Sequence, residues 1–231
     1  MQGMNNAQRR SCFGLIHRRQ CWLPTVRGWL LLLLVPTGLM IVAARWAYPF
    51  LSVSDPVFGG GLVAEGWMPD YAMEEVISEF KRNHYSKIYV TGGPIERGAP
   101  LHEYRTSAEA GAATLIRLGL NADVVRAVPA PLIRKDRTYI AAVALKNWLL
   151  QHEIAESSLT VISLGVHARR SRVLFQEAMG RSTRIGVIAI EDRSYDSNRW
   201  WESSQGFRTV TDEIIAYAYV RLLFQPRKER V

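Results

Sequence analysis

The stretch LTVISLGVHARRSR, residues 159–172, joins an apolar run to a basic one and decides the fold class. Leu159, Val161 and Ile162 are the side chains expected of a buried strand. Gly165 then suits a sharp turn, and the basic residues after it begin a stretch with helical composition. A buried strand that passes through a glycine corner into a helix is typical of a parallel sheet with helical crossovers.

The same pattern recurs along the chain. Short apolar runs predict strands over residues 61–65, 87–93, 122–128, 159–165 and 184–190. Amphipathic stretches between and after them predict helices over residues 71–82, 106–118, 136–150, 167–179 and 210–224. Strands that alternate with helices in this way form βαβ units. The sequence therefore predicts an α/β fold: a three-layer, Rossmann-like domain with a mainly parallel sheet of about five strands.

A different composition precedes this domain. The run GWLLLLLVPTGLMIVAA, residues 28–44, contains no charged residue and is followed by aromatic side chains of the kind found at membrane interfaces. It predicts one transmembrane helix over residues 28–50. We expect a short tether over 51–58, the α/β domain over 59–225 and a charged tail over 226–231. A cleaved signal peptide is the alternative, because Val42-Ala43-Ala44 resembles a cleavage site.

Charge sets the expected orientation and excludes one class of partner. The net charge is +8, but residues 1–45 hold arginines and no acid, so the rest of the chain is close to neutral. Nucleic acid is therefore not an expected partner. The positive-inside rule puts a basic segment, residues 1–27, in the cytoplasm and the domain outside the cell (inner) membrane as a single-pass protein. The arginines are Arg9, Arg10, Arg18, Arg19, Arg27 and Arg45.

The sequence gives no sign of a metal site and does not identify a cofactor. Both cysteines, Cys12 and Cys21, precede the domain, so the domain has neither a disulfide framework nor a thiolate metal site. The motif TGGP, residues 91–94, is neither a dinucleotide-binding fingerprint nor a P-loop. We therefore predict no metal and leave the cofactor unassigned.

Candidate site residues fall beyond the carboxyl ends of the predicted strands, where open parallel sheets bind ligands. The amides of two glycines and polar or basic side chains are expected to bind an anion: Gly92, Gly93, Thr138, Ser163 and Arg170. An imidazole and two carboxylates are candidate acid–base catalysts: His167, Glu65 and Glu109. His167 and Arg170 share a helical face at i, i+3. Structural roles stay open for several of them: a turn at the glycines, helix capping at Thr138 and its neighbour Asp136, a favourable position in the helix dipole for Glu109, a corner residue at His167 and a solvated face at the arginines.

Five of these motifs, in this order, resemble the YdcF-like domain family over residues 59–190. They are LVAEGW (62–67), TGG (91–93), TSAEAGAATLIRLG (106–119), RKDRTYIAAVAL (134–145) and the H-x-x-R corner at His167 and Arg170. The resemblance implies a Rossmann-like domain, often membrane-anchored with its body outside the cytoplasm. It also implies a role in the assembly of the cell envelope and of cell-wall polymers such as peptidoglycan.

Three functional hypotheses follow. The first is a membrane-anchored domain that binds an anionic, phosphate-bearing envelope precursor or lipid-linked saccharide. The second is a non-catalytic, membrane-anchored scaffold or regulator of envelope biosynthesis. The third is a nucleotide-dependent enzyme tethered to the cytoplasmic leaflet with the opposite topology. Trp200 and Trp201, in a predicted loop over 195–208, are expected to stack on a sugar, to lie among lipid headgroups or to cover the edge of the sheet.

Overall fold

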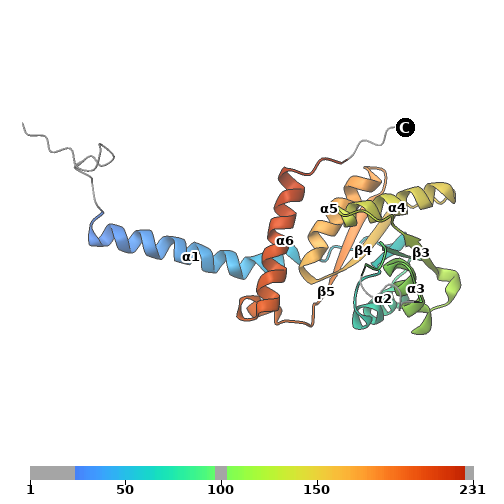
Figure 1. Ribbon diagram of the computed structural model, residues 1–231, viewed down its shortest axis with the longest axis horizontal. Helices are drawn as coiled ribbons and strands as arrows, with labels where there is room; N and C mark the ends of the chain where they lie inside the picture. Colours follow the sequence, from blue (N-terminus) through green and yellow to red (C-terminus); the bar gives the residue numbers. More distant parts are fainter. Residues whose placement is uncertain (1–23, 97–102, 227–231) are drawn as a thin grey trace, which may run out of the picture. The chain divides into compact units, whose positions relative to one another are not determined.

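The computed structural model describes residues 24–96 and 103–226 and divides the chain into two compact units, Met1–Val42 and Ala43–Val231. Most of the basic segment expected over 1–27, including both cysteines, and nearly all of the charged tail lie outside the described residues. Helix α1 (Val26–Leu51) has a mean hydropathy of 2.0 over its most apolar part and is long and apolar enough to cross a membrane (Figure 1). An N-terminal signal sequence has the same properties. The last turns of α1, from Ala43, belong to the second unit.

The second unit contains a five-stranded, all-parallel sheet, which confirms the predicted α/β fold (Figure 1). The strands are β1 (Gly61–Glu65), β2 (Ile88–Gly92), β3 (Val125–Pro129), β4 (Ser158–Leu164) and β5 (Arg184–Ile190). Their order is β3-β2-β1-β4-β5. Strands β2 and β3 are therefore added on one side of β1, and β4 and β5 on its other side. This switch puts a crevice at the carboxyl ends of β1 and β4, where ligands bind in folds of this kind.

Helices cover both faces of the sheet and connect its strands. The longer ones are α2 (Asp70–Arg82), α3 (Ser107–Arg117), α4 (Arg137–Gln151), α5 (Ala168–Met179) and α6 (Ser204–Leu222). Short 3-10 segments are η2 (Ala122–Val124), η3 (Gly165–His167) and η4 (Ser197–Glu202), the last with a kink at Arg199. Strand β1 is buried on both faces: Leu62 and Ala64 pack with α2 and α3, and Val63 packs with α4 and α5. Continuous burial explains why β1 reads as an unbroken apolar run.

A third cluster packs the start of the second unit against α6 and η4. Leu51 and Val210 are fully buried in it, and the indole nitrogen of Trp200 donates a hydrogen bond to the carbonyl oxygen of Ala44 at 3.0 Å. Trp201 lies under the guanidinium of Arg45, 5.4 Å from ring centre to Cζ. The two tryptophans therefore pack on residues 44–45.

Three segments differ from the predictions for local reasons. The strand predicted over 122–128 begins only at Val125, because its first three residues form η2, in which the Asn121 side chain accepts from the amide of Asp123. Helix α6 begins at Ser204 and not near residue 210, because the Ser203 hydroxyl caps it by accepting from the amide of Gly206 at 2.9 Å. The segment predicted as a tether is packed on the sheet. Asp55 forms a bridge with Val187, and the Thr160 hydroxyl donates to the carbonyl oxygen of Val57 at 2.7 Å.

The two glycines after β2 have different surroundings, and this leads to a first prediction. A Cβ on Gly92 would lie 2.9 Å from the backbone nitrogen of Ala108 in α3, whereas a Cβ on Gly93 would meet nothing within 4 Å. Gly92→Ala is expected to lower the free energy of unfolding by about 1–3 kcal/mol through overpacking, and Gly93→Ala by less than about 0.5 kcal/mol. Urea unfolding of the full chain in detergent micelles measures both. Equal costs for the two substitutions would contradict the close approach of α3 to Gly92.

Candidate functional site

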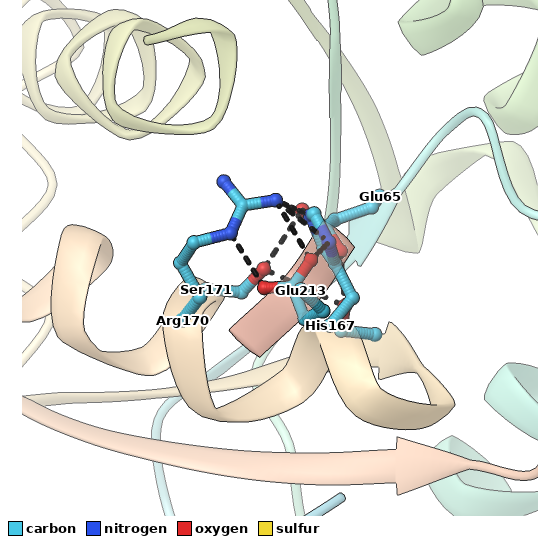
Figure 2. Close-up of polar contacts among 6 residues, drawn as sticks. Glu65, His167, Arg170, Ser171 and Glu213 are labelled. Atoms are coloured by element: carbon cyan, nitrogen blue, oxygen red, sulfur yellow. Dashed lines mark hydrogen bonds and ion pairs between the residues drawn. The ribbon is translucent and has the colours of Figure 1, made fainter. Parts of the chain in front are cut away.

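Five polar side chains meet at the carboxyl ends of β1 and β4 (Figure 2). Glu65 is the last residue of β1, His167 ends the turn after β4, Arg170 and Ser171 lie in the first turn of α5, and Glu213 comes from the middle of α6. We call these residues the polar cluster. Four of its members lie in or directly after β1 and β4. The fifth, Glu213, lies in α6, more than forty residues later in the sequence.

Glu65 is a buried carboxylate held by two hydroxyl groups. Its side chain is 4 % exposed. The Ser163 hydroxyl donates to one carboxylate oxygen, and the Ser171 hydroxyl donates to the other at 3.1 Å. A buried carboxylate without such donors would carry a large desolvation cost. The two serines therefore keep Glu65 at the end of β1 with one oxygen 3.8 Å from Nε2 of His167.

Glu213 is the second buried carboxylate and joins the two cationic side chains of the cluster. Its Oε1 accepts from Nε of Arg170 at 2.6 Å, and its Oε2 lies 3.0 Å from Nδ1 of His167 and 3.2 Å from Nη2 of Arg170. Burial by itself raises the pKa of Glu213, but the hydrogen bonds and charges of His167 and Arg170 outweigh it, so the pKa is lowered. Glu213 is therefore ionised at neutral pH.

Glu213 also sets the orientation of His167. The imidazole Nδ1 lies 3.0 Å from Oε2 of Glu213, which only accepts hydrogen bonds, and 2.9 Å from Nη2 of Arg170, which only donates them. Nε2 lies 3.3 Å from the same Arg170 nitrogen and 3.8 Å from Oε1 of Glu65. The ring is held from the side by Trp67, whose centroid is 5.3 Å away in an edge-to-face arrangement. The imidazole is therefore held between two carboxylates and one guanidinium.

A cavity of about 680 Å³ opens in front of the polar cluster. Glu65, His167 and Arg170 form one part of its lining. Its volume falls within the range of about 300–1,000 Å³ that is usual for small-molecule sites. Figure 2 shows the second terminal nitrogen of Arg170 pointing away from the cluster, with no interaction drawn to it. A donor is therefore left for a ligand.

One wall of the cavity is rich in donors that have no partner among the described residues. The hydroxyl of Thr91 is buried without a hydrogen bond. Arg134 and Arg137 line the cavity, and no ion pair or hydrogen bond of either is found within residues 24–96 and 103–226. Gly93 presents open space in place of a side chain. Unpaired cations beside bare backbone are the chemistry that binds an anion.

The start of α4 completes this wall. Thr138 lies in the first turn of α4 and lines the cavity. Asp136 takes the N-cap position with a left-handed φ of 55°, and its side chain makes no capping hydrogen bond. The structure therefore does not bear out capping by the Asp136 side chain, since an N-cap residue usually has an extended backbone and this one is left-handed. The helix therefore presents its first N–H groups, with their partial positive charge, without a side-chain cap.

The cavity lining also contains apolar side chains. They come from the loop before α4, from α4 and α5, and from α6: Leu132, Ile133, Ile140, Leu174, Ala216, Tyr219 and Val220. A cavity lined by both donors and hydrocarbon suits a ligand with a charged head and an apolar body.

Six of the eight residues predicted for the site line this cavity. They are Glu65, Gly92, Gly93, Thr138, His167 and Arg170. Ser163 lies behind them: it is fully buried and contacts Glu65, so it positions that carboxylate and does not face the cavity.

Glu109 does not line the cavity. It forms a capping box at the start of α3, in which its carboxylate accepts from the amides of Arg105 and Thr106 at 3.0 and 2.9 Å. Thr106 is the N-cap, where the sequence had also offered Ser107 as a cap of the predicted helix over 106–118, and the Thr106 hydroxyl accepts from the amide of Glu109. The motif T-x-x-E is the sequence signature of this arrangement. The structure thus gives Glu109 the capping role.

Glu213 and Ser171 are the members of the polar cluster that were not predicted from sequence. For Glu213 the signal was present: Gly206, Val210, Glu213 and Tyr217 follow one another at i, i+4, i+7 and i+11, which places them on one helical face. Gly206, Val210 and Glu213 are all buried on that face. A charge on the inner face of a helix needs a cationic partner, and Arg170 is that partner.

The lowered pKa of Glu213 gives a prediction about pH. A carboxyl group whose pKa is lower in the folded state stabilises the fold above its unfolded pKa, about 4.3, and this contribution disappears as the pH falls through the folded pKa. Glu213→Gln should therefore be less stable than the wild type at neutral pH, and the difference should shrink by about pH 3. Urea unfolding of both proteins at the two pH values measures this. A difference that does not change with pH would show that the charge of Glu213 contributes nothing to folding.

Within residues 24–96 and 103–226, no group of three or more His, Cys, Asp and Glu side chains is placed to hold a metal ion.

Comparisons with known proteins assign neither a family nor a function. No family model, no curated protein and no solved structure matches the chain.

Proposed function

We propose that the second unit binds a phosphate-bearing ligand with an apolar chain in the cavity at the carboxyl ends of the sheet. The observation that carries this proposal is the mixed lining of the cavity. Arg134, Arg137 and the Thr91 hydroxyl supply donors that have no partner among the described residues, and Leu132, Tyr219 and their neighbours supply hydrocarbon. A free sugar phosphate would use only the donors, and a neutral lipid only the hydrocarbon.

In this proposal the phosphate lies between Gly93 and the start of α4. The amide of Gly93 and the guanidinium groups of Arg137 and Arg170 bind its oxygens. His167 and Glu65 lie beside it as a pair that takes up and supplies a proton, with Glu213 as the residue that positions His167.

The membrane helix sets the biological context that we propose. Helix α1 anchors the chain as a single span, and the arginines that precede it favour a cytoplasmic N-terminus with the α/β domain on the outer side. A ligand with a phosphate head and an apolar chain is the chemistry of lipid-linked envelope precursors. Together with the motif resemblance to the YdcF-like domain family, this supports a role in cell-envelope or cell-wall polymer assembly.

The test is calorimetric titration of the full chain in lipid nanodiscs with three probes: farnesyl phosphate, farnesol and inorganic phosphate. We expect farnesyl phosphate to bind more tightly than either part alone, and we expect His167→Ala and Arg170→Ala to weaken it. Absence of farnesyl phosphate binding, or binding that neither substitution changes, would refute the proposal and favour the scaffold role.

A further inference from the structure

Helix α6 carries a row of exposed apolar side chains on its outer face. Phe207, Ile214, Ile215 and Leu222 are 54, 41, 63 and 80 % exposed. Their spacing of i, i+7, i+8 and i+15 places them on one side of the helix. The opposite side holds the buried residues of the third cluster and Glu213. A helix on the surface of a soluble domain is expected to expose polar residues, so this row indicates a surface that is covered by something apolar.

The row lies close to the place where α1 joins the domain. The ring of Phe50, in the last turn of α1, contacts the ring of Tyr217 in α6 with 5.6 Å between centroids. Leu51 is buried with Val210 of the same helix. Trp46 and Phe50 are themselves 69 and 46 % exposed, so residues 46–50 also expose apolar side chains.

The length of α1 indicates what covers this surface. At 1.5 Å per residue its 26 residues extend for about 39 Å, while a hydrocarbon core is about 30 Å thick. The final turns of a spanning α1 therefore emerge among the lipid headgroups. These turns pack on α6 without an intervening linker, because Leu51 is already part of the core of the domain.

We propose that the outer face of α6 lies in the headgroup layer of the membrane that α1 spans. Phe207, Ile214 and Leu222 would then be buried among the upper acyl carbons. Arg208 and Arg221 flank the row and are exposed, so their guanidinium groups reach lipid phosphates, as in other interfacial helices. Asp212 lies further round the helix, away from the centre of the row. This inference rests on the membrane anchorage in the proposed function and is independent of the ligand in the cavity.

Quenching by labelled lipid tests the proposal on the full chain. Cys12 and Cys21 are replaced by Ser, and an environment-sensitive fluorophore is attached to one new cysteine at a time: Ile215→Cys, Leu222→Cys or Leu150→Cys. Leu150 is the matched control, since it is 67 % exposed, apolar and on α4. A fourth label at Leu33→Cys reports whether α1 is in the bilayer. The protein is placed in single-chain phosphatidylcholine nanodiscs that contain lipid with a headgroup nitroxide.

We expect the labels at 215 and 222 to be quenched several-fold more than the label at 150, and the label at 33 to show the blue-shifted emission of a hydrocarbon environment. Equal quenching at 215, 222 and 150 would overturn the proposal while leaving the anchor intact. Protection of 215 that grows with chain density in vesicles, without lipid quenching, would assign the face to a second copy and also overturn it. A label at 33 that reports water would refute the anchorage itself.

Discussion

Glu213→Ala is expected to lower the free energy of unfolding by about 3 kcal/mol, the cost typical of removing one partner from a buried ion pair. The substitution removes the carboxylate that binds Arg170 through two oxygens and His167 through one. Arg170 is 18 % exposed, so its charge would lose its partner while still largely shielded from water. Chemical unfolding of the full chain in micelles measures the effect, and for a protein of this size the melting temperature should fall by roughly 10 °C.

An exposed ion pair provides the control. Arg117 and Glu103 form a salt bridge in which both side chains are 70 % exposed, and Glu103→Ala should cost less than about 1 kcal/mol. The double substitution Glu213→Ala with Arg170→Ala should be more stable than the sum of the two single effects predicts. Each single variant leaves one buried charge without its partner, whereas the double variant has removed both charges. Additive effects would show that the two residues do not interact in the folded protein.

The combined substitution Arg134→Ala and Arg137→Ala is expected to weaken farnesyl phosphate binding about 100-fold. Both guanidinium groups line the donor-rich wall, and neither has a partner among the described residues to hold it away from a ligand. A hydrogen bond to a charged group contributes about 1.5–3 kcal/mol, so the loss of the bond from Arg137, together with the charge of Arg134 in the same cavity lining, accounts for a change of this size. Calorimetric titration in nanodiscs measures the dissociation constant.

Arg181→Ala is the matched control for this prediction. Arg181 is exposed but does not line the cavity, so its removal changes the net charge of the chain without changing the site. Farnesyl phosphate should bind Arg181→Ala as it binds the wild type, and farnesol should bind all three proteins alike. Equal weakening by Arg181→Ala would mean that the arginines act through the general field of the protein and not through contact.

The fold could be predicted from sequence because its strands are buried on both faces. Runs such as GLVAE at 61–65 and RIGVIAI at 184–190 have no polar alternation, and the structure places both as strands at these residues. The ends of helices were predicted less well than the strands. Helix α6 begins at Ser204, inside a stretch rich in serine and tryptophan that was predicted as a loop. The helix can start there because the hydroxyl of Ser203 caps it.

The candidate site was predictable where strand ends determine it, and not where a distant helix does. Glu65, Gly93 and His167 follow strands of one parallel sheet, so topology alone brings them to a common edge. Glu213 reaches the same place through the packing of α6 on η3 and α5, which the sequence does not specify. Glu109 comes after β2 in the sequence, but its carboxylate is bound by backbone amides at the start of α3 and does not reach the site. The T-x-x-E spacing alone could have predicted this capping role.

A crystal structure of the full chain with bound farnesyl phosphate tests most directly whether the cavity is an anion site. We expect the phosphorus between Gly93 and the first turn of α4, with phosphate oxygens within hydrogen-bond distance of the Gly93 amide and of the Arg137 or Arg170 guanidinium, and the prenyl chain against Leu132 and Tyr219. Phosphate bound away from these groups, or a cavity that stays without ligand at saturating concentration, would contradict the account.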